Sequence, residues 1–302
     1  MLNGVLNIYK EKSYTSHDVV AKMRGILRQK KIGHTGTLDP DAQGVLPVCL
    51  GQATKLCQFL TDHDKVYQAV MRLGIETDTE DLSGQILAQR EVICSKEEVE
   101  TAVLSFIGPY DQIPPMYSAL KVDGKRLYDL ARQGKVVERK ARPVSIHKIE
   151  IEEINLPKVT MTVHCSKGTY IRTLCHDIGK TLGCGAAMES LLRLQAGPFT
   201  MENSITLSQL ETVRDEGKLD EYIISVEQLL SNYPKAVTRP EADHLIYNGN
   251  PVKSFHVTIK EQVEAGELVR MYDSQSCFLG LYEYEREKQR FKPQKMFLEQ
   301  TP

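Results

Sequence analysis

The chain has 302 residues and a formal net charge of −2 at pH 7, with 41% hydrophobic and 26% charged residues. This is the composition of an ordinary globular protein: no apolar run approaches the roughly 20 residues of a transmembrane helix, and the N-terminus does not resemble a signal peptide. Seven scattered cysteines without a C-x-x-C pair exclude a disulfide framework and a zinc knuckle, so we expect a reduced, cytoplasmic protein that holds no metal.

Strand and helix patterns alternate irregularly along the first 200 residues. The first expected elements in chain order are a strand over 4–9, a helix from Ser16, a glycine-rich loop over 33–44, a helix around 53–61, a strand over 65–74 and an acidic turn over 77–84. A helix capped by Ser95 follows, then an extended segment over 109–119, a hairpin turn at 121–125 and a helix ended by Gly134. The last elements are strands over 145–154 and 158–165 and a helix ended by Gly183. This irregular order predicts an α+β fold with a mixed, largely antiparallel sheet.

The helix expected after Ser95 has the clearest local signal. Ser95 and Glu98 have the spacing of a capping box, in which each side chain accepts a hydrogen bond from the backbone of the other. The helix is expected to turn four apolar residues inward, namely Val99, Val103, Phe106 and Ile107.

A domain boundary is expected near residues 232–236, after an acidic helical stretch. Residues 1–231 then form the larger domain. Residues 235–302 combine one short helical pattern with several strand patterns, which predicts a small β-rich accessory domain.

Charge is segregated along the chain although the total is close to zero. Residues 1–60 carry eight Lys or Arg against four Asp or Glu, residues 121–148 nine against three, and residues 286–295 five against one. Residues 202–232 carry the compensating acid, with seven Asp or Glu against two Lys or Arg. One such basic segment is usually a solvated surface, but three of them predict a positive face for a polyanion, most readily a nucleic acid.

The loop GHTGTLDPDAQG over residues 33–44 concentrates chemistry beside an apolar strand. Pro40 pushes Asp39 towards an extended backbone, and the glycines around it allow sharp bends, so the carboxylate can be held away from the chain. An Asp-Pro pair more often forms a simple Asx-turn, and a histidine such as His34 is more often a turn or surface residue. The residues alone leave these alternatives open.

Common cofactor sites are missing from the sequence. The loop lacks the Gly-Lys-Ser/Thr ending of a P-loop, and GCGAA at 183–187 follows a helix, where a helix cap is the better interpretation. The sequence also lacks a G-x-S-x-G elbow and a pair of histidines at metal-ligand spacing. We therefore expect no cofactor.

Five segments in order resemble the motifs of the bacterial tRNA pseudouridine-55 synthases, the TruB type. They are GHTGTLDP with the following GVLPVCLGQATK, KVYQAVMRLGIETDTEDLSG (65–84), PPMYSALKVDGKRLYDLARQG (114–134), CSKGTYIRTLCHDIGKTLGCGA (165–186) and LLRLQAGPF (191–199). The resemblance covers roughly residues 1–200. The loop departs from the family's commonest sequence at Asp41 and Gln43, neither of which matches the family's catalytic position.

The resemblance implies an activity and a nucleophile. The family isomerises uridine 55 in the T-loop of tRNA to pseudouridine: the bond from ribose C1′ to N1 breaks and the flipped base is rejoined through C5. Asp39 matches the family's aspartate nucleophile, and whether it forms a covalent adduct or drives an elimination stays open. The reaction needs no redox partner and no hydrolysis, which agrees with the missing cofactor motifs.

Further roles follow from the resemblance alone. Tyr67 matches the catalytic tyrosine whose ring stacks on the target uracil and whose hydroxyl is expected to assist proton removal at C5. Arg172 matches the arginine that pairs with the nucleophile and keeps it ionised. The remaining matched positions are expected to bind substrate, namely His34, Tyr170, Leu191 and Lys121. Lys121 lies in a predicted RNA-binding insertion over about residues 109–142. The family usually has a PUA-like RNA-binding module at the place of residues 235–302, so we expect one there.

The resemblance leaves two alternatives to a stand-alone tRNA enzyme. One is a guide-RNA-dependent pseudouridine synthase subunit, which shares the aspartate loop but works within a ribonucleoprotein. The other is a non-catalytic tRNA-binding or tRNA-folding protein in which Asp39 is structural. The expected partner is the T-arm stem-loop of tRNA, with no membrane or metal partner, and the expected protein is a monomer.

Overall fold

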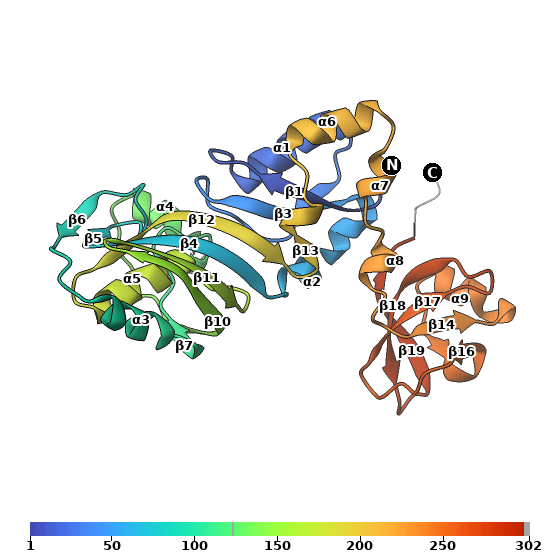
Figure 1. The fold of residues 1–302 in the computed structure, drawn as a ribbon. Coiled ribbons are helices and arrows are strands. Elements are labelled where there is room, and N and C mark those ends of the chain that lie inside the picture. Colours follow the sequence, from blue (N-terminus) through green and yellow to red (C-terminus); the bar gives the residue numbers. More distant parts are fainter. Residues whose placement is uncertain (123, 299–302) are drawn as a thin grey trace.

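The computed structural model describes residues 1–122 and 124–298, which form two main sheets and two small hairpins (Figure 1). The larger sheet has the order β1-β3-β12-β4-β11-β10-β7, with β2 on β3 and β13 on β12, and the smaller has the order β15-β19-β18-β17-β14-β16. Neighbouring strands are antiparallel except in the β12–β3 and β14–β17 pairs. The predicted α+β fold with a mixed, largely antiparallel sheet is therefore confirmed.

The larger sheet and the hairpins use the first 200 residues. Their strands are β1 (Gly4–Lys10), β2 (Ile32–His34), β3 (Gln43–Leu50), β4 (Lys65–Leu73), β5 (Ile75–Thr77), β6 (Ile86–Gln89), β7 (Gly108–Gln112), β8 (Lys121–Val122), β9 (Lys125–Arg126), β10 (Arg142–Asn155), β11 (Lys158–Cys165), β12 (Ala186–Ala196) and β13 (Phe199–Thr200). The smaller sheet contains β14 (Lys235–Thr238), β15 (Val252–Lys253), β16 (Val257–Ile259), β17 (Leu268–Tyr272), β18 (Phe278–Glu285) and β19 (Arg290–Met296). Asp123 of the predicted hairpin turn and residues 299–302 of the predicted C-terminal domain lie outside the described residues.

Helices are short and lie between the strands. They are α1 (Ser16–Leu27), α2 (Cys57–Thr61), α3 (Lys96–Leu104), α4 (Leu127–Arg132), α5 (Ile171–Thr181), α6 (Leu207–Asp215), α7 (Leu219–Tyr222), α8 (Val226–Leu229) and α9 (Asp243–Tyr247), with 3₁₀ turns η1 (Gly51–Leu56), η2 (Met201–Asn203), η3 (Pro240–Ala242) and η4 (Ser254–His256). Within the described ranges, no helix combines the length and the apolar composition that crossing a bilayer requires.

Most sequence-predicted elements are present, with two informative differences. The capping box of Ser95 and Glu98 begins α3 as predicted, but α3 ends at Leu104. Ile107 lies beyond that end and is 45% exposed, so its predicted inward position is wrong. The acidic turn expected at 77–84 lies within the β5–β6 hairpin, whose short strands were not predicted.

The core of the larger sheet lies on one face of β4 and β11. Burial alternates strictly along β4, and its buried residues Tyr67, Ala69 and Met71 pack in one cluster with Val99 of α3 and Leu174 of α5. The opposite face of these strands is partly exposed. Strands β1 and β3 have their own apolar layer, which α1 and α6 complete (Figure 1).

The two main sheets share apolar contacts. Leu281 of β18 and Phe297, which follows β19, belong to the same buried cluster as Val5 of β1 and Leu56 of η1. The Nζ of Lys55 also donates to the Met296 carbonyl, at 2.6 Å. The smaller sheet therefore packs against the larger one through this shared cluster. The division into residues 1–231 and 235–302 stays a prediction.

Candidate active site

The loop that carries Asp39 joins β2 to β3 and is fixed on both sides of the carboxylate. The Ser16 hydroxyl at the start of α1 accepts from the Leu38 backbone N–H at 2.9 Å. The Pro40 carbonyl accepts from the Ser13 backbone N–H and from Lys10 Nζ, each at 3.0 Å. These bonds hold the backbone directly before and after Asp39, so the position of the loop is fixed on both sides of the carboxylate.

Lys10 is a supporting residue that the sequence did not reveal. It ends β1, is fully buried, and lies near the carboxylates of Asp39 and Asp41. Burial lowers the pKa of Lys10 to about 8, and the two carboxylates oppose part of that shift. The Lys10 ammonium therefore places positive charge near the carboxylates of Asp39 and Asp41. Its hydrogen bond to the Pro40 carbonyl also helps to fix the position of the loop.

Arg193 on β12 is a second unpredicted support. Its side chain is buried, donates from Nε to the Val45 carbonyl at 2.6 Å, and donates from Nη2 to the Gly36 carbonyl at 3.3 Å. The backbone of Arg193 also passes close to Gly44, where a Cβ atom would lie 2.2 Å from the Arg193 carbonyl oxygen. With φ at +106°, Gly44 has a conformation and a space that only glycine fits.

Gly44→Ala is expected to lower the free energy of unfolding by about 2–4 kcal/mol, because it adds both backbone strain and a clash with a backbone oxygen. Gly25→Ala is the matched control: Gly25 is an exposed residue in α1, and a Cβ there meets nothing within 4 Å. That change is expected to stabilise the protein by about 0.5–1 kcal/mol. Urea denaturation measures both, and equal effects of the two substitutions would contradict the close approach of β12.

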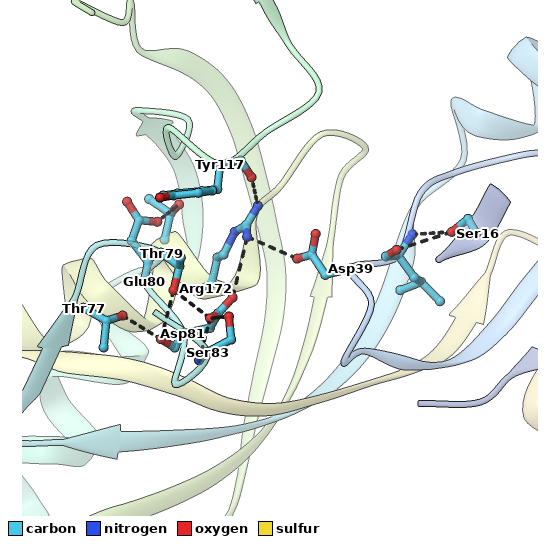
Figure 2. Close-up of polar contacts among 11 residues, drawn as sticks. Ser16, Asp39, Thr77, Thr79, Glu80, Asp81, Ser83, Tyr117 and Arg172 are labelled. Carbon is cyan, nitrogen blue, oxygen red and sulfur yellow. Dashed lines mark hydrogen bonds and ion pairs between the residues drawn. The ribbon is translucent and has the colours of Figure 1, made fainter. Parts of the chain in front are cut away.

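Arg172 brings two carboxylates together at the start of α5 (Figure 2). Its Nη1 lies 3.5 Å from Asp39 Oδ2 and 3.6 Å from Asp81 Oδ2, and its side chain is 6% exposed. Its Nη2 donates to the Tyr117 carbonyl. Arg172 thus links the aspartate loop, the turn after β5 and the segment after β7, which are distant in sequence.

Asp81 is held in place by its own turn. Its Oδ1 accepts from the Thr79 hydroxyl at 2.7 Å and from the Ser83 backbone N–H at 2.9 Å, while its carbonyl accepts from the Thr77 hydroxyl at 2.6 Å (Figure 2). The sequence pattern predicted only an acidic turn here. Its dense Thr-Asp-Ser composition was the available signal that a carboxylate is being oriented.

The net effect of these surroundings raises the pKa of the Asp39 carboxyl. Although 40% of the side chain is exposed, desolvation by the surrounding protein is the main cause, and the Asp81 carboxylate adds to it. The Arg172 guanidinium acts in the opposite direction, as the sequence predicted, but it is shared between two carboxylates. The predicted Arg172–Asp39 pair is therefore present, but the shared guanidinium does not outweigh the effect of burial on the pKa of Asp39.

Two tyrosines lie close to the carboxylate. Tyr67 on β4 is buried in the same cluster as Leu38, and Tyr170 precedes α5 with its ring centre 5.8 Å from the Arg172 guanidinium. Burial raises the pKa of both hydroxyls, and the Asp39 charge contributes to both shifts. The structure thus gathers these aromatic rings, the carboxylate and the guanidinium in one place.

Tyr170 and Leu191, which were expected to bind substrate, are positioned by strands of the larger sheet. The Gln112 side chain, at the end of β7, donates to the Tyr170 carbonyl at 2.9 Å and accepts from its backbone N–H at 2.8 Å. Gln112 is buried and was not singled out by the sequence. Leu191 on β12 is half-buried and packs against the cluster that contains Tyr67.

His34 lies at the edge of the site, on a basic groove. It ends β2, its ring meets that of His17 edge-on with centroids 5.3 Å apart, and burial lowers its pKa to about 4. His34 is therefore neutral at pH 7. The groove, of about 550 Å³, is also lined by Arg24, Lys30 and Lys31.

Lys121 lies on a separate small unit. Strands β8 and β9 and helix α4 have their own apolar cluster, built on Met116, Leu127 and Leu130. Lys121 is exposed and lines a basic hollow of about 630 Å³ on this unit. Because the Tyr117 carbonyl accepts from Arg172 of the site, the structure connects this unit to Asp39 through Arg172.

Comparisons with known proteins agree along the chain. The N-terminal domain of the TruB family pseudouridylate synthases matches residues 24–171, and the tRNA pseudouridylate synthase B C-terminal domain matches residues 172–231. The tRNA pseudouridine synthase B of Lachnoclostridium phytofermentans is 51% identical, covering 98% of this chain and 100% of its own. That of Alkaliphilus oremlandii is 50% identical, covering 90% of each chain.

Two solved structures share the fold. A chain in the crystal structure of a Cbf5-Nop10-Gar1 complex is 29% identical with a TM-score of 0.74, covering 98% of this chain and 85% of that chain. A chain in the structure of an H/ACA RNP bound to a substrate RNA containing 2′-deoxyuridine is 26% identical with a TM-score of 0.73 and the same coverage. With both family domains matched in order and about half of all residues identical to curated members over nearly its whole length, the chain belongs to the TruB family of pseudouridylate synthases.

Proposed function

We propose that this protein isomerises uridine 55 in the T-loop of tRNA to pseudouridine, with Asp39 as the nucleophile. One observation carries the proposal: a carboxylate on a firmly held loop lies 3.5 Å from a buried guanidinium, beside the buried Tyr67 and the half-buried Tyr170. The relatives named tRNA pseudouridine synthase B, which match over nearly full length, supply the substrate class. The proposal includes action in the cytoplasm, as a monomer.

The proposed reaction breaks one bond of the substrate and forms another, with Asp39 acting on the sugar. The C1′–N1 bond of the flipped uridine breaks as Asp39 either bonds to C1′ or removes a proton from the neighbouring sugar carbon. When C5 of the turned uracil bonds to C1′, the bond to Asp39 breaks or the sugar proton is returned. C5 then gives up its proton and N1 gains one. All atoms stay within the substrate, so neither a redox partner nor a metal is required. Flipping costs a few kcal/mol, and less for a base that is already in a loop.

Tyr67 is assigned to holding the base. Because burial raises the pKa of its hydroxyl, Tyr67 is protonated at neutral pH and is not a phenolate base. Its ring offers a stacking surface for uracil, and its hydroxyl can form a hydrogen bond near C5. Tyr170 and Leu191 complete the walls of the base pocket, while His34 and Lys121 are assigned to the RNA around it.

The direct test is to map pseudouridine in unmodified tRNA after incubation with the purified protein. Modification at position 55 alone is expected, both in full tRNA and in an isolated T-arm stem-loop. Modification of another uridine, or activity only after a guide RNA is added, would overturn the proposal. The alternative of a ribonucleoprotein subunit is disfavoured because the chains from the H/ACA RNP and the Cbf5-Nop10-Gar1 complex are 26% and 29% identical, whereas the tRNA pseudouridine synthases B reach 51%.

Activity is expected to fall on acidification through a pKa above the ordinary aspartate value of 3.8, because the reaction needs ionised Asp39 and burial raises its pKa. A raised pKa also means that the folded state holds this proton more tightly, so Asp39's contribution to stability falls as pH rises through the same range. Single-turnover rates across pH, with folding monitored by circular dichroism, measure the first effect. A rate that stays constant down to the acid unfolding transition would contradict it.

We assign residues 1–231 to catalysis and residues 235–302 to PUA-like binding of the tRNA backbone. The turn between β18 and β19 carries the exposed cations Arg286 and Lys288, whose ion pairs are long, at 3.9 and 3.8 Å. Reversing both charges to Glu is expected to weaken binding of full tRNA and to lower its logarithmic salt slope by about 0.7–0.9 for each phosphate that is no longer neutralised. Affinity for an isolated T-arm is expected to change much less, and an equal loss of affinity on both RNAs would contradict the assignment.

A further inference from the structure

Three potential metal ligands meet on the larger sheet, away from Asp39. Among the residues that the structure describes, Asp64, His147 and His164 form one group whose ligand atoms all lie within 4.8 Å of one another. The Nε2 of His147 lies 3.2 Å and the Nε2 of His164 lies 3.9 Å from Asp64 Oδ2. Their side chains are 39%, 43% and 50% exposed in the order His147, His164, Asp64, so an ion can reach them from solvent.

The sheet itself places the two imidazoles side by side. His164 on β11 points to the face opposite the buried Val163 and Cys165. On β10 the register with β11 shifts between Ile146 and Lys148, and this bulge puts His147 on the same exposed face. The two ring centroids are 4.9 Å apart. Because both strands are paired within the larger sheet, the backbone places the two imidazoles together before any ion binds.

Asp64 comes from the turn before β4, and its position is fixed too. Its carbonyl accepts from the Gly197 backbone N–H at 3.0 Å. The neighbouring cations are engaged elsewhere: Lys167 pairs with Asp62 at 2.8 Å, and Lys65 Nζ donates to backbone carbonyls of the same turn. The Asp64 carboxylate therefore faces the imidazoles.

We propose that Asp64, His147 and His164 bind one first-row transition-metal ion of the Zn²⁺ type. With metal–ligand bonds of about 2.0–2.1 Å, two ligand atoms of a tetrahedral site lie roughly 3.3–3.4 Å apart. The 3.2 Å separation of His147 and Asp64 already fits, and the 3.9 Å separation of His164 and Asp64 needs a shift of roughly half an ångström. Two imidazoles and one carboxylate suit Zn²⁺, Ni²⁺ or Co²⁺, whereas Mg²⁺ and Ca²⁺ take oxygen ligands.

The site is structural, because it lies on the sheet face opposite α5 and Arg172. A bound ion ties β10 and β11 to the turn before β4, while water fills the remaining coordination position. The expectation that the protein holds no metal is revised by this proposal. No local sequence pattern indicated the site, because the two histidines lie on different strands and only the β10–β11 register brings them together.

The test uses untagged full-length protein, stripped of metal with a chelator and titrated with ZnCl₂ by calorimetry. Wild type is expected to bind one equivalent of Zn²⁺, and the double variant His147→Ala/His164→Ala is expected to lack this equivalent. The control His244→Ala, which removes an exposed histidine of α9, is expected to retain it. At about 100 times the dissociation constant, Zn²⁺ is expected to raise the melting temperature of wild type, and not of the double variant, by about 5 °C.

CoCl₂ serves as a second probe because thiolate ligands give Co²⁺ a strong charge-transfer band in the near ultraviolet. The expected spectrum has visible bands without that band, which separates this site from binding at exposed Cys277. Asp64→Asn, a single isosteric change at the surface, is expected to weaken binding and checks the result independently of the histidine variants. Equal stoichiometry in wild type and the double variant, or no bound equivalent in wild type, overturns the proposal.

Discussion

Asp39→Asn is expected to reduce pseudouridine formation by more than roughly a thousandfold, because the amide keeps the shape of the side chain but is not a nucleophile. The loop bonds through Ser16, Leu38 and Pro40 involve no atom of the Asp39 side chain, so the loop is expected to keep its position. Affinity for tRNA is expected to stay within a few-fold of wild type. Single-turnover assays and filter binding measure the two effects separately.

The raised pKa of Asp39 gives this substitution a second expected signature. The ionised carboxyl is held in surroundings that favour its protonated form, so the folded state gains nothing from the charge. Asn cannot ionise, and the melting temperature of Asp39→Asn is therefore expected to equal or exceed that of wild type. Such a gain in stability with a loss of activity is characteristic of residues retained for function.

Asp41→Asn is the matched control, because Asp41 is an exposed carboxylate two residues further along the same loop. Its activity is expected to stay within about threefold of wild type, because substitutions of exposed side chains usually have small effects. The assignment of Asp39 fails if Asp39→Asn keeps a rate within tenfold of wild type. A non-catalytic role for the protein would be supported if neither variant changed the modification of tRNA.

Arg172→Lys is expected to be the second most damaging change. A lysine ammonium is a single compact charge and cannot contact Asp39, Asp81 and the Tyr117 carbonyl with the fixed geometry of a guanidinium. One half-buried carboxylate is then left without its partner, which costs about 1 kcal/mol of stability. Because a misplaced nucleophile loses about 100-fold in rate for each ångström, the rate is expected to fall by about that factor or more.

The pH profile distinguishes a positioning effect from simple unfolding. Arg172 opposes the raised pKa of Asp39, so its replacement is expected to move the acidic limb of the rate profile to higher pH. Arg90→Lys is the control: Arg90 pairs with Glu76 at 2.7 Å, but its side chain is 45% exposed, and exposed ion pairs contribute about 0–1 kcal/mol. An unshifted limb in Arg172→Lys would show that Arg172 does not act through the nucleophile.

Local chemistry let the sequence predict much of this protein. The capping box at Ser95, the alternation that forms β4 and the glycine and proline punctuation around Asp39 depend on residues within a few positions of one another. Each pattern therefore specifies its element without knowledge of the rest of the chain. The ordered motifs indicated the family in the same way, because the order and spacing of motifs can be seen in the sequence itself.

The tertiary structure alone decided which residues support the site. Arg193 reaches the Val45 carbonyl, Gln112 holds Tyr170, and Lys10 lies under the aspartate loop because strands distant in the sequence are neighbours in the sheet. The sharing of Arg172 between Asp39 and Asp81 has the same origin, and it changed the expected electrostatics of the nucleophile. Hydrogen bonds and ion pairs act over only about 3–4 Å, and distances on that scale are set by sheet order and register, which no local pattern contains.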